Sequence, residues 1–215
     1  KQVRDEIEEA SEQEDRLLLA LGELTDQAEQ MLAESKEADF SKIDCQAGCK
    51  SCCVVNVAIL FPEGMAIAEY LQTLPVVEKS LIAERLEELW RAVRGLTDDE
   101  RIGLHQSCAF LDGSGLCRIY PVRPLLCRSV TSTSAESCRE ALTEHLFGEE
   151  RPVMMNLLQR EMFESVYLGV GEGLEEAGLD GRGVKLTGLV RHLLKKPAAG
   201  AEWLTGKPIN WHDLA

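Results

Sequence analysis

Eight cysteines are the residues of this 215-residue chain whose type and spacing could do chemistry. Four fall within residues 45–53, and the other four follow between residues 108 and 138 at intervals of 9, 10 and 11. They are Cys45, Cys49, Cys52, Cys53, Cys108, Cys117, Cys127 and Cys138. Thiolates bind zinc, copper(I) and the iron of iron–sulfur clusters. Cysteines scattered through a core would not bunch in this way, so the spacing predicts either a disulfide framework or a thiolate metal site.

Metal ligation explains these cysteines better than disulfides do. Disulfide-dense chains are usually short, secreted and poor in core, whereas this chain is 45% hydrophobic and does not open with the basic and apolar segments of an export signal. Cys52 and Cys53 are also adjacent, which makes a bridge between them awkward. A thiol redox centre is the third alternative. We therefore expect metal or cluster ligation, with binding coupled to folding.

The first four cysteines have the spacing of ligands. Cys45-x3-Cys49-x2-Cys52 places three sulfurs in eight residues, and Gly48 permits the sharp turn that would let them converge. The side chains of Cys52 and Cys53 diverge, so they serve different metal atoms or only one is a ligand. Eight thiolates fit two four-ligand sites, or one cluster with spare thiols. The sequence leaves both open.

The same spacing also occurs in radical S-adenosylmethionine enzymes. Those enzymes need a parallel α/β barrel, and alternating strands and helices are absent from this sequence. Their usual aromatic residue before the last cysteine is Ser51 here, and Cys53 has no place in their scheme. We therefore set this interpretation aside.

Three arginines stand close to cysteines in the second group. Arg118 and Arg128 directly follow Cys117 and Cys127, and Arg123 lies between them. Cations favour deprotonated sulfur and stabilise an anionic centre, so Arg118, Arg123 and Arg128 are candidate cofactor-binding residues. Ordinary salt bridges in an acid-rich chain are the alternative.

The whole pattern resembles a known family. The four cysteines of 45–53 are followed by Cys108-x3-Asp112-x-Ser114-Gly115-x-Cys117-x-Ile119-Tyr120-x2-Arg123-Pro124-x2-Cys127-Arg128. This order resembles the YkgJ-like cysteine-cluster family, which is described as zinc- or iron-chelating and includes flagellin lysine N-methylase. The resemblance spans about residues 45–138. It implies that the cysteines from 45 to 127 are ligands of an iron–sulfur or zinc centre. The resemblance only weakly implies lysine methylation by this chain, because the rest of the chain carries no motif of that activity.

The elements that must position these cysteines are mostly helical. Apolar residues at helical spacing predict helices at 61–74, 76–94, 135–146, 153–176 and 184–194. The stretch 108–120 contains Asp112-Gly113-Ser114-Gly115 between apolar residues, which predicts a hairpin. The predicted fold is mainly α, an irregular helical domain with a small β-hairpin around a cysteine-rich metal site.

An acidic helix is predicted ahead of this domain. Residues 1–38 form one segment and residues 39–215 a single cysteine-cluster domain. The apolar seam of the helix is close to heptad spacing, at Val3, Ile7, Ala10, Leu17, Leu21, Leu24, Ala28 and Met31. Its second half either packs on its own domain or pairs with a partner, and a homodimer through this helix is one such pairing.

Composition restricts the remaining function classes. A net charge of −14 and 5% aromatic residues argue against binding nucleic acid. The sequence contains no run of 18 apolar residues, so no membrane-spanning helix is predicted. We expect a cytoplasmic protein with a protein partner. An iron–sulfur cluster, favoured as the 4Fe-4S type, with a redox or cluster-dependent role is preferred, because eight thiols with almost no histidine suit it. The alternatives are a structural zinc protein that binds a protein partner, and a lysine N-methylase-like enzyme. Whether the chain is an enzyme stays open.

Overall fold

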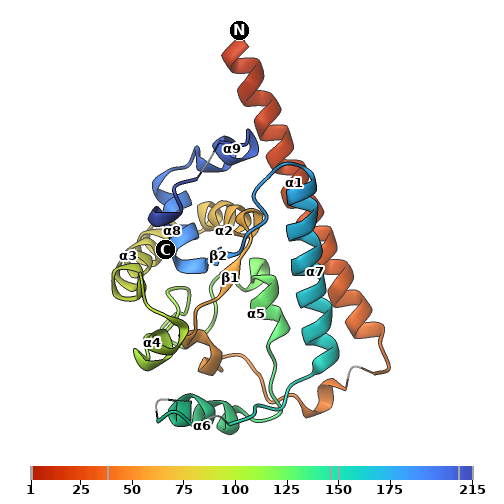
Figure 1. Ribbon diagram of the computed structural model, residues 1–215, viewed down its shortest axis with the longest axis vertical. Coiled ribbons are helices and arrows are strands. Elements are labelled where there is room, and N and C mark those ends of the chain that lie inside the picture. Colours follow the sequence, from red (N-terminus) through yellow and green to blue (C-terminus); the bar gives the residue numbers. More distant parts are fainter. Residues whose placement is uncertain (1, 38, 146, 150, 208, 215) are drawn as a thin grey trace.

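The computed structural model describes residues 2–37, 39–145, 147–149, 151–207 and 209–214, with side chains from residue 12 onward except that of residue 213. Residues 1, 38, 146, 150, 208 and 215 belong to segments predicted from the sequence but lie outside this description. The side chains of Val3, Ile7 and Ala10, in the predicted N-terminal helix, also lie outside it. The helices are α1 (Gln2–Glu34), α2 (Phe61–Thr73), α3 (Val76–Val93), α4 (Asp98–Gly103), α5 (Leu125–Ser129), α6 (Ala135–His145), α7 (Leu157–Glu176), α8 (Leu186–Lys195) and α9 (Ala199–Leu204). The mainly α fold is confirmed (Figure 1).

Short elements join these helices. The 3-10 turns are η1 (Phe40–Lys42), η2 (Ser51–Val54), η3 (Tyr120–Val122) and η4 (Trp211–Asp213). Strands β1 (Ala58–Ile59) and β2 (Val184–Lys185) pair antiparallel, with Ala58 opposite Lys185. The predicted hairpin at 108–120 makes one bridge, between Leu111 and Cys117. It does not extend into strands, because Asp112 draws the chain into a tight turn by accepting hydrogen bonds from the amides of Ser114 and Leu116 at 2.8 and 3.0 Å.

Two apolar clusters hold the helices. The larger one joins α2, α3, α8 and α9, and within it the rings of Phe61 and Trp203 stack with centroids 4.6 Å apart. On its edge, Glu87 of α3 binds Arg191 of α8 at 2.6 Å, and the Arg191 guanidinium lies 3.5 Å from the centre of the Trp90 ring. This cluster forms the left half of the molecule in Figure 1.

The smaller cluster joins α1, α5 and α7. It buries Leu21, Ala28 and Leu32 of α1 against Leu125 and Phe163, and Figure 1 shows α1 and α7 side by side. The second half of the N-terminal helix therefore packs on its own chain. Pairing of this helix with a second copy, and the division of the chain at residue 38, stay predictions.

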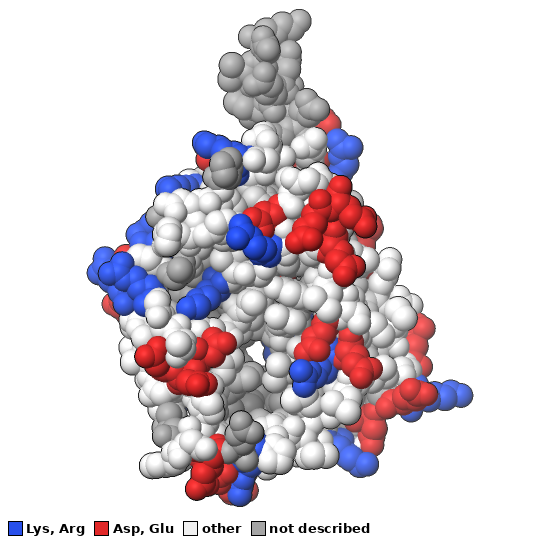
Figure 2. Space-filling view, viewed as in Figure 1, with Lys and Arg blue, Asp and Glu red and all other residues white. Residues whose placement is uncertain are grey.

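The surface is acidic, in keeping with the net charge of −14. The C-terminal end of α7 carries exposed Glu172, Glu175 and Glu176, and acidic side chains gather at this place in Figure 2. In the described part of the chain, no helix has both the length and the apolar character needed to cross a membrane.

Candidate metal centre

Backbone hydrogen bonds bring the cysteine-bearing segments together. The amide of Cys108 donates to the carbonyl of Cys53 at 2.7 Å, which joins the hairpin to η2. The amide of Asp44 donates to the carbonyl of Ser132 at 2.8 Å, which joins the first cysteine loop to the segment before α6. Segments that are 55 to 88 residues apart in sequence (108 − 53 and 132 − 44) thus meet at one place, as the spacing predicts.

Two glycines let the hairpin approach the first cysteine loop closely. Gly48 and Gly115 have φ of +87° and +80°, a region that side chains other than glycine rarely adopt. A Cβ on Gly115 would lie 3.2 Å from the carbonyl oxygen of Gly48, and a Cβ on Gly48 would lie 3.6 Å from that of Ser114. The tip of the hairpin therefore rests backbone to backbone on the first cysteine loop.

Helices α5 and α6 position the last two cysteines. The buried carboxylate of Glu63 at the start of α2 accepts hydrogen bonds from the amides of Leu60 and Leu125, both at 2.7 Å, so it fixes the N-terminus of the helix that carries Cys127. Asp44 accepts from the amide of Ala135 at 2.8 Å, and Ser134 accepts from Ser137 at 3.1 Å. These caps begin α6, which carries Cys138.

All eight cysteines are free thiols, and their charges interact. Burial raises the pKa of Cys108 to about 11 and that of Cys127 to about 12. Burial also raises the pKa of Cys117, and that of Cys45 although the Cys45 sulfur accepts a hydrogen bond from the amide of Ser132 at 3.2 Å. Without metal these thiols keep their protons, so a metal that binds them must displace protons.

Cys52 and Cys53 form a coupled pair. The Cys53 thiol donates toward the Cys52 sulfur, which, together with the charge of Arg123, lowers the pKa of Cys52 to about 6. The same interaction, followed by burial, raises the pKa of Cys53 well above its ordinary value. The protonation of one thiol is therefore coupled to that of the other. Cys52 is the thiol that most readily becomes an anion.

The three predicted arginines lie in different surroundings. Arg123 acts on the charges of Cys52, Cys117 and Cys127. Arg128 binds the carboxylate of Glu29 and donates to the carbonyl of Arg123 at 2.7 Å, and its charge also reaches Cys117.

Arg118 instead binds Glu78 and lies 3.9 Å from Asp112. The structure therefore brings Arg123 and Arg128 to the thiols and turns Arg118 toward carboxylates. A cofactor-binding role for these three residues stays a prediction.

A fourth arginine was missed by the sequence analysis. Arg101 of α4 is 2% exposed, its Nη1 has no hydrogen-bond partner among the described residues, and its charge interacts with Cys108. A buried cation without a full set of partners costs free energy unless an anion lies beside it. An anionic thiolate centre at Cys108 would supply that anion. Burial of Arg101 beside Cys108 is therefore consistent with a metal bound there. The sequence gives no sign of this role, because Arg101 lies seven residues before Cys108 in an ordinary helical segment.

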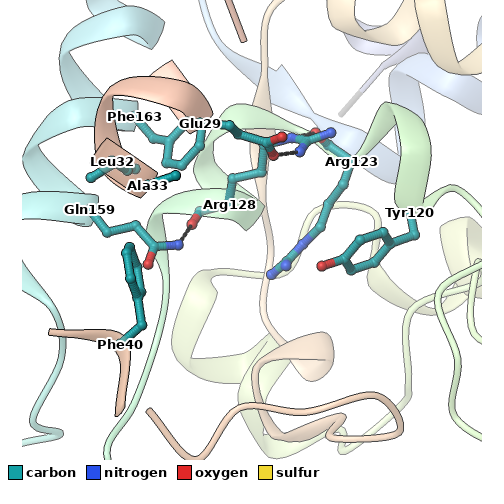
Figure 3. A pocket seen from close by; sticks show the side chains of 9 residues that line it. All are labelled: Glu29, Leu32, Ala33, Phe40, Tyr120, Arg123, Arg128, Gln159 and Phe163. Carbon is teal, nitrogen blue, oxygen red and sulfur yellow. Dashed lines mark hydrogen bonds and ion pairs between the residues drawn. The ribbon is translucent and has the colours of Figure 1, made fainter. Parts of the chain in front are cut away.

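A pocket of about 190 Å³ has Arg123 and Arg128 in its wall. It lies between α1, η1, η3, α5 and α7, and Figure 3 shows Arg123 extending along it next to the Tyr120 ring, with the guanidinium 5.9 Å from the ring centre. The Glu29–Arg128 pair closes one side, and Phe40 and Phe163 supply apolar walls. Arg123 thus joins an open recess to the cysteine cluster.

The eight predicted ligands are all cysteines, so every donor atom would be sulfur. Sulfur donors suit a soft or borderline metal. In the described part of the chain, no three His, Cys, Asp or Glu side chains are yet arranged as ligands of one ion.

The family model CxxCxxCC, described as a "Putative zinc- or iron-chelating domain", matches residues 44–152, about half of the chain. The chain belongs to this family. The predicted family resemblance is confirmed, and the protein is a zinc- or iron-chelating cysteine-cluster protein. Neither the curated proteins nor the solved structures contain a match to the chain. The matched residues begin one position before Cys45 and include the other seven cysteines and all three predicted arginines.

Proposed function

We propose that the protein holds iron in an iron–sulfur cluster, favoured as the 4Fe-4S type, and uses it in a redox role. The observation that carries this proposal is the all-thiol donor set. Charges that act on the half-buried thiols Cys108 and Cys127 come from other cysteines and from Arg101 and Arg123. Clusters are held by thiolates, and nearby positive charge stabilises their anionic state.

The chain's own residues would tune such a centre. A bound cluster supplies one-electron chemistry. Arg123 and Arg101 would offset its negative charge from two sides, and Arg123 also faces the pocket of Figure 3. Cys45 is exposed, so the centre would approach the surface there. A protein partner that exchanges electrons would dock on that side.

Anaerobic purification tests this proposal. We expect a brown protein with iron and acid-labile sulfide in equal amounts, a broad visible absorption that bleaches on reduction, and an electron paramagnetic resonance signal of the reduced cluster. Cys127→Ser should lose the visible absorption, and Ser129→Ala, a change on the same helix that leaves every thiol in place, should keep it. A colourless protein with stoichiometric zinc and no sulfide would overturn the proposal.

A structural zinc protein is the second candidate. It is favoured by the way the cysteines tie together three distant segments, because structural zinc sites are closed four-ligand sites that often stabilise small loop-rich regions. In that case the metal is colourless and redox-inactive, and the protein acts by presenting its helices to a partner.

A further inference from the structure

We infer that the pocket of Figure 3 binds a small organic acid, with the carboxylate of the ligand on Arg123 and its ring between Phe40 and Tyr120. In the described part of the chain, none of the eight cysteines lines this pocket. The inference therefore goes beyond the proposed function, and it holds whichever metal the cysteines bind.

Two guanidinium groups line the pocket, and one of them is already engaged. Arg128 binds Glu29 through Nη1. Its Nε and Nη2 donate to the carbonyls of Arg123 and Pro121 at 2.7 and 3.1 Å. The half-buried guanidinium of Arg123 has no hydrogen-bond or ion-pair partner among the residues that the structure describes, and in Figure 3 it ends inside the pocket beside the Tyr120 ring. Its fork of N–H donors matches the two oxygens of a carboxylate.

The charges in the wall favour a ligand with one negative charge. The charged residues that line the described pocket are Glu29, Arg123 and Arg128. Because Glu29 pairs with Arg128, Arg123 is the cation without a carboxylate partner. A doubly charged phosphate would meet this one cation and be repelled by Glu29. The charge of Arg123 also acts on cysteines of the candidate metal centre, so a bound carboxylate and the thiols share it.

The size and the apolar walls of the pocket favour a ligand with a single ring. Its volume of about 190 Å³ is smaller than the roughly 300–1,000 Å³ of sites for drug-sized molecules, and a cavity of about 150 Å³ holds one benzene. Leu32 and Phe163 form buried parts of the wall. Phe40 and Tyr120 are 42% and 63% exposed and lie on either side of the Arg123 guanidinium in Figure 3. A ring between them would cover exposed aromatic surface.

Benzoate is the probe that tests the site. In ligand-detected nuclear magnetic resonance titrations of anaerobically purified protein, we expect saturable binding at one site. Acetate lacks the ring, benzamide lacks the charge and phosphate carries a second charge, so each should bind more weakly than benzoate. A short peptide that ends in phenylalanine with a free carboxylate distinguishes two sources of the ligand. Tighter binding than benzoate would assign the site to the end of a protein chain, and weaker binding would assign it to a free acid.

Two variants and a control locate the binding. Arg123→Gln should weaken benzoate binding by about tenfold or more, because it removes the charge that holds the carboxylate. Arg160→Gln is the matched control, since Arg160 pairs with Glu164 at 2.7 Å and is not among the described residues of the wall. Phe40→Ala should also weaken benzoate binding, because it removes part of the apolar wall. Circular dichroism reports whether each variant folds. If Arg123→Gln does not fold, Phe40→Ala and the ranking of the probes decide.

Several results would overturn the inference. One is the absence of saturable benzoate binding by the unchanged chain, and another is equal binding of benzoate and benzamide. Tighter binding of phosphate than of benzoate would contradict the assignment to a monocarboxylate. A folded Arg123→Gln variant that binds benzoate as tightly as Arg160→Gln would show that Arg123 does not hold the ligand. None of these readouts measures metal, so the site and the iron–sulfur proposal can fail separately.

Discussion

At the scale of single residues, the charged side chains around the thiols are the features that bear most on metal binding. The cysteines and their spacing could be identified from the sequence, because ligand type and interval are local properties. Arg101 could not, because its role depends on burial and on Cys108, which only the fold brings near. Arg118 lies directly after a cysteine and yet binds Glu78, so proximity in sequence is a poor guide to which cation faces a centre.

Arg101→Met should change stability with opposite signs in the two metal states. In loaded protein the arginine offsets an anionic centre, so its loss should destabilise the fold and weaken the metal beside Cys108. In stripped protein the same change removes a buried, incompletely bonded charge, and such replacements are neutral or stabilising by about 1–4 kcal/mol. Urea unfolding of both forms under anaerobic conditions measures this. A loss of equal size in both states would show that Arg101 has no relation to the metal.

Glu63 should make the unfolding free energy depend on pH. Burial raises the pKa of its carboxyl to about 7, against 4.5 for an exposed glutamate, although two amide donors and the charge of Arg128 act in the opposite direction. The folded state therefore holds this proton more tightly than the unfolded state. The stabilisation is complete below pH 4.5 and is lost as the pH rises to about 7, by roughly 3 kcal/mol at most.

Glu63→Gln isolates this contribution. Glutamine does not titrate, so the difference between the unfolding free energies of the two proteins should fall steeply between pH 4.5 and 7 and be flat outside that window. The variant also leaves one of two buried amide donors poorly paired, which costs about 1–3 kcal/mol at low pH. Tyr167, which also interacts with Glu63, does not change charge in this range. Parallel stability curves would contradict the assignment.

At the scale of elements, periodicity predicts the helices well and the strands poorly. The expected helices at 61–74, 76–94 and 184–194 correspond to α2, α3 and α8 within two residues at each end, because an amphipathic face repeats over several turns. The helix expected from residue 153 begins at Leu157 instead, where the Asn156 side chain accepts from the amide of Gln159. Strands β1 and β2 have two residues each, too few for any pattern, and they pair over a long sequence separation.

Gly188 of α8 shows how tightly the C-terminal turn sits on this helix. A Cβ there would lie 1.8 Å from the carbonyl oxygen of Leu214, which is buried backbone. Gly188→Ala should therefore displace η4 and cost about 1–3 kcal/mol, despite the better helix propensity of alanine. Gly22→Ala is the matched control, because a Cβ on Gly22 in helix α1 would have no described atom within 4 Å beyond its chain neighbours and its own helix backbone. The control should gain about 0.5–1 kcal/mol in urea unfolding. Similar shifts in both variants would refute the contact.

At the scale of the whole molecule, the fold divides into helices that pack in two apolar clusters and a cysteine-bearing region that we expect bound metal to stabilise. The helices of the two apolar clusters bury large side chains such as Phe61, Leu86 and Phe163. The cysteine-bearing hairpin adds Ala109 and Phe110 to the larger cluster, and beside them the loops bring together thiols, which repel one another once ionised. From the sequence, a metal-dependent loop region could be predicted. Its contacts with α5 and α6 could not, because single hydrogen bonds between distant segments leave no periodic signal.

Removal of the metal should loosen one region and leave the other protected. In hydrogen–deuterium exchange of anaerobic protein, chelation should speed exchange at residues 44–54, 107–118 and 131–138, because the bonds between Asp44 and Ser132 and between Cys53 and Cys108 are the links that ligation would tighten. Helices α2, α3 and α8, which pack in the larger apolar cluster, should keep slow exchange. Uniform loss of protection would instead mean that metal binding and folding of the whole chain are one cooperative step, and unchanged exchange in the loops would show that they hold together without metal.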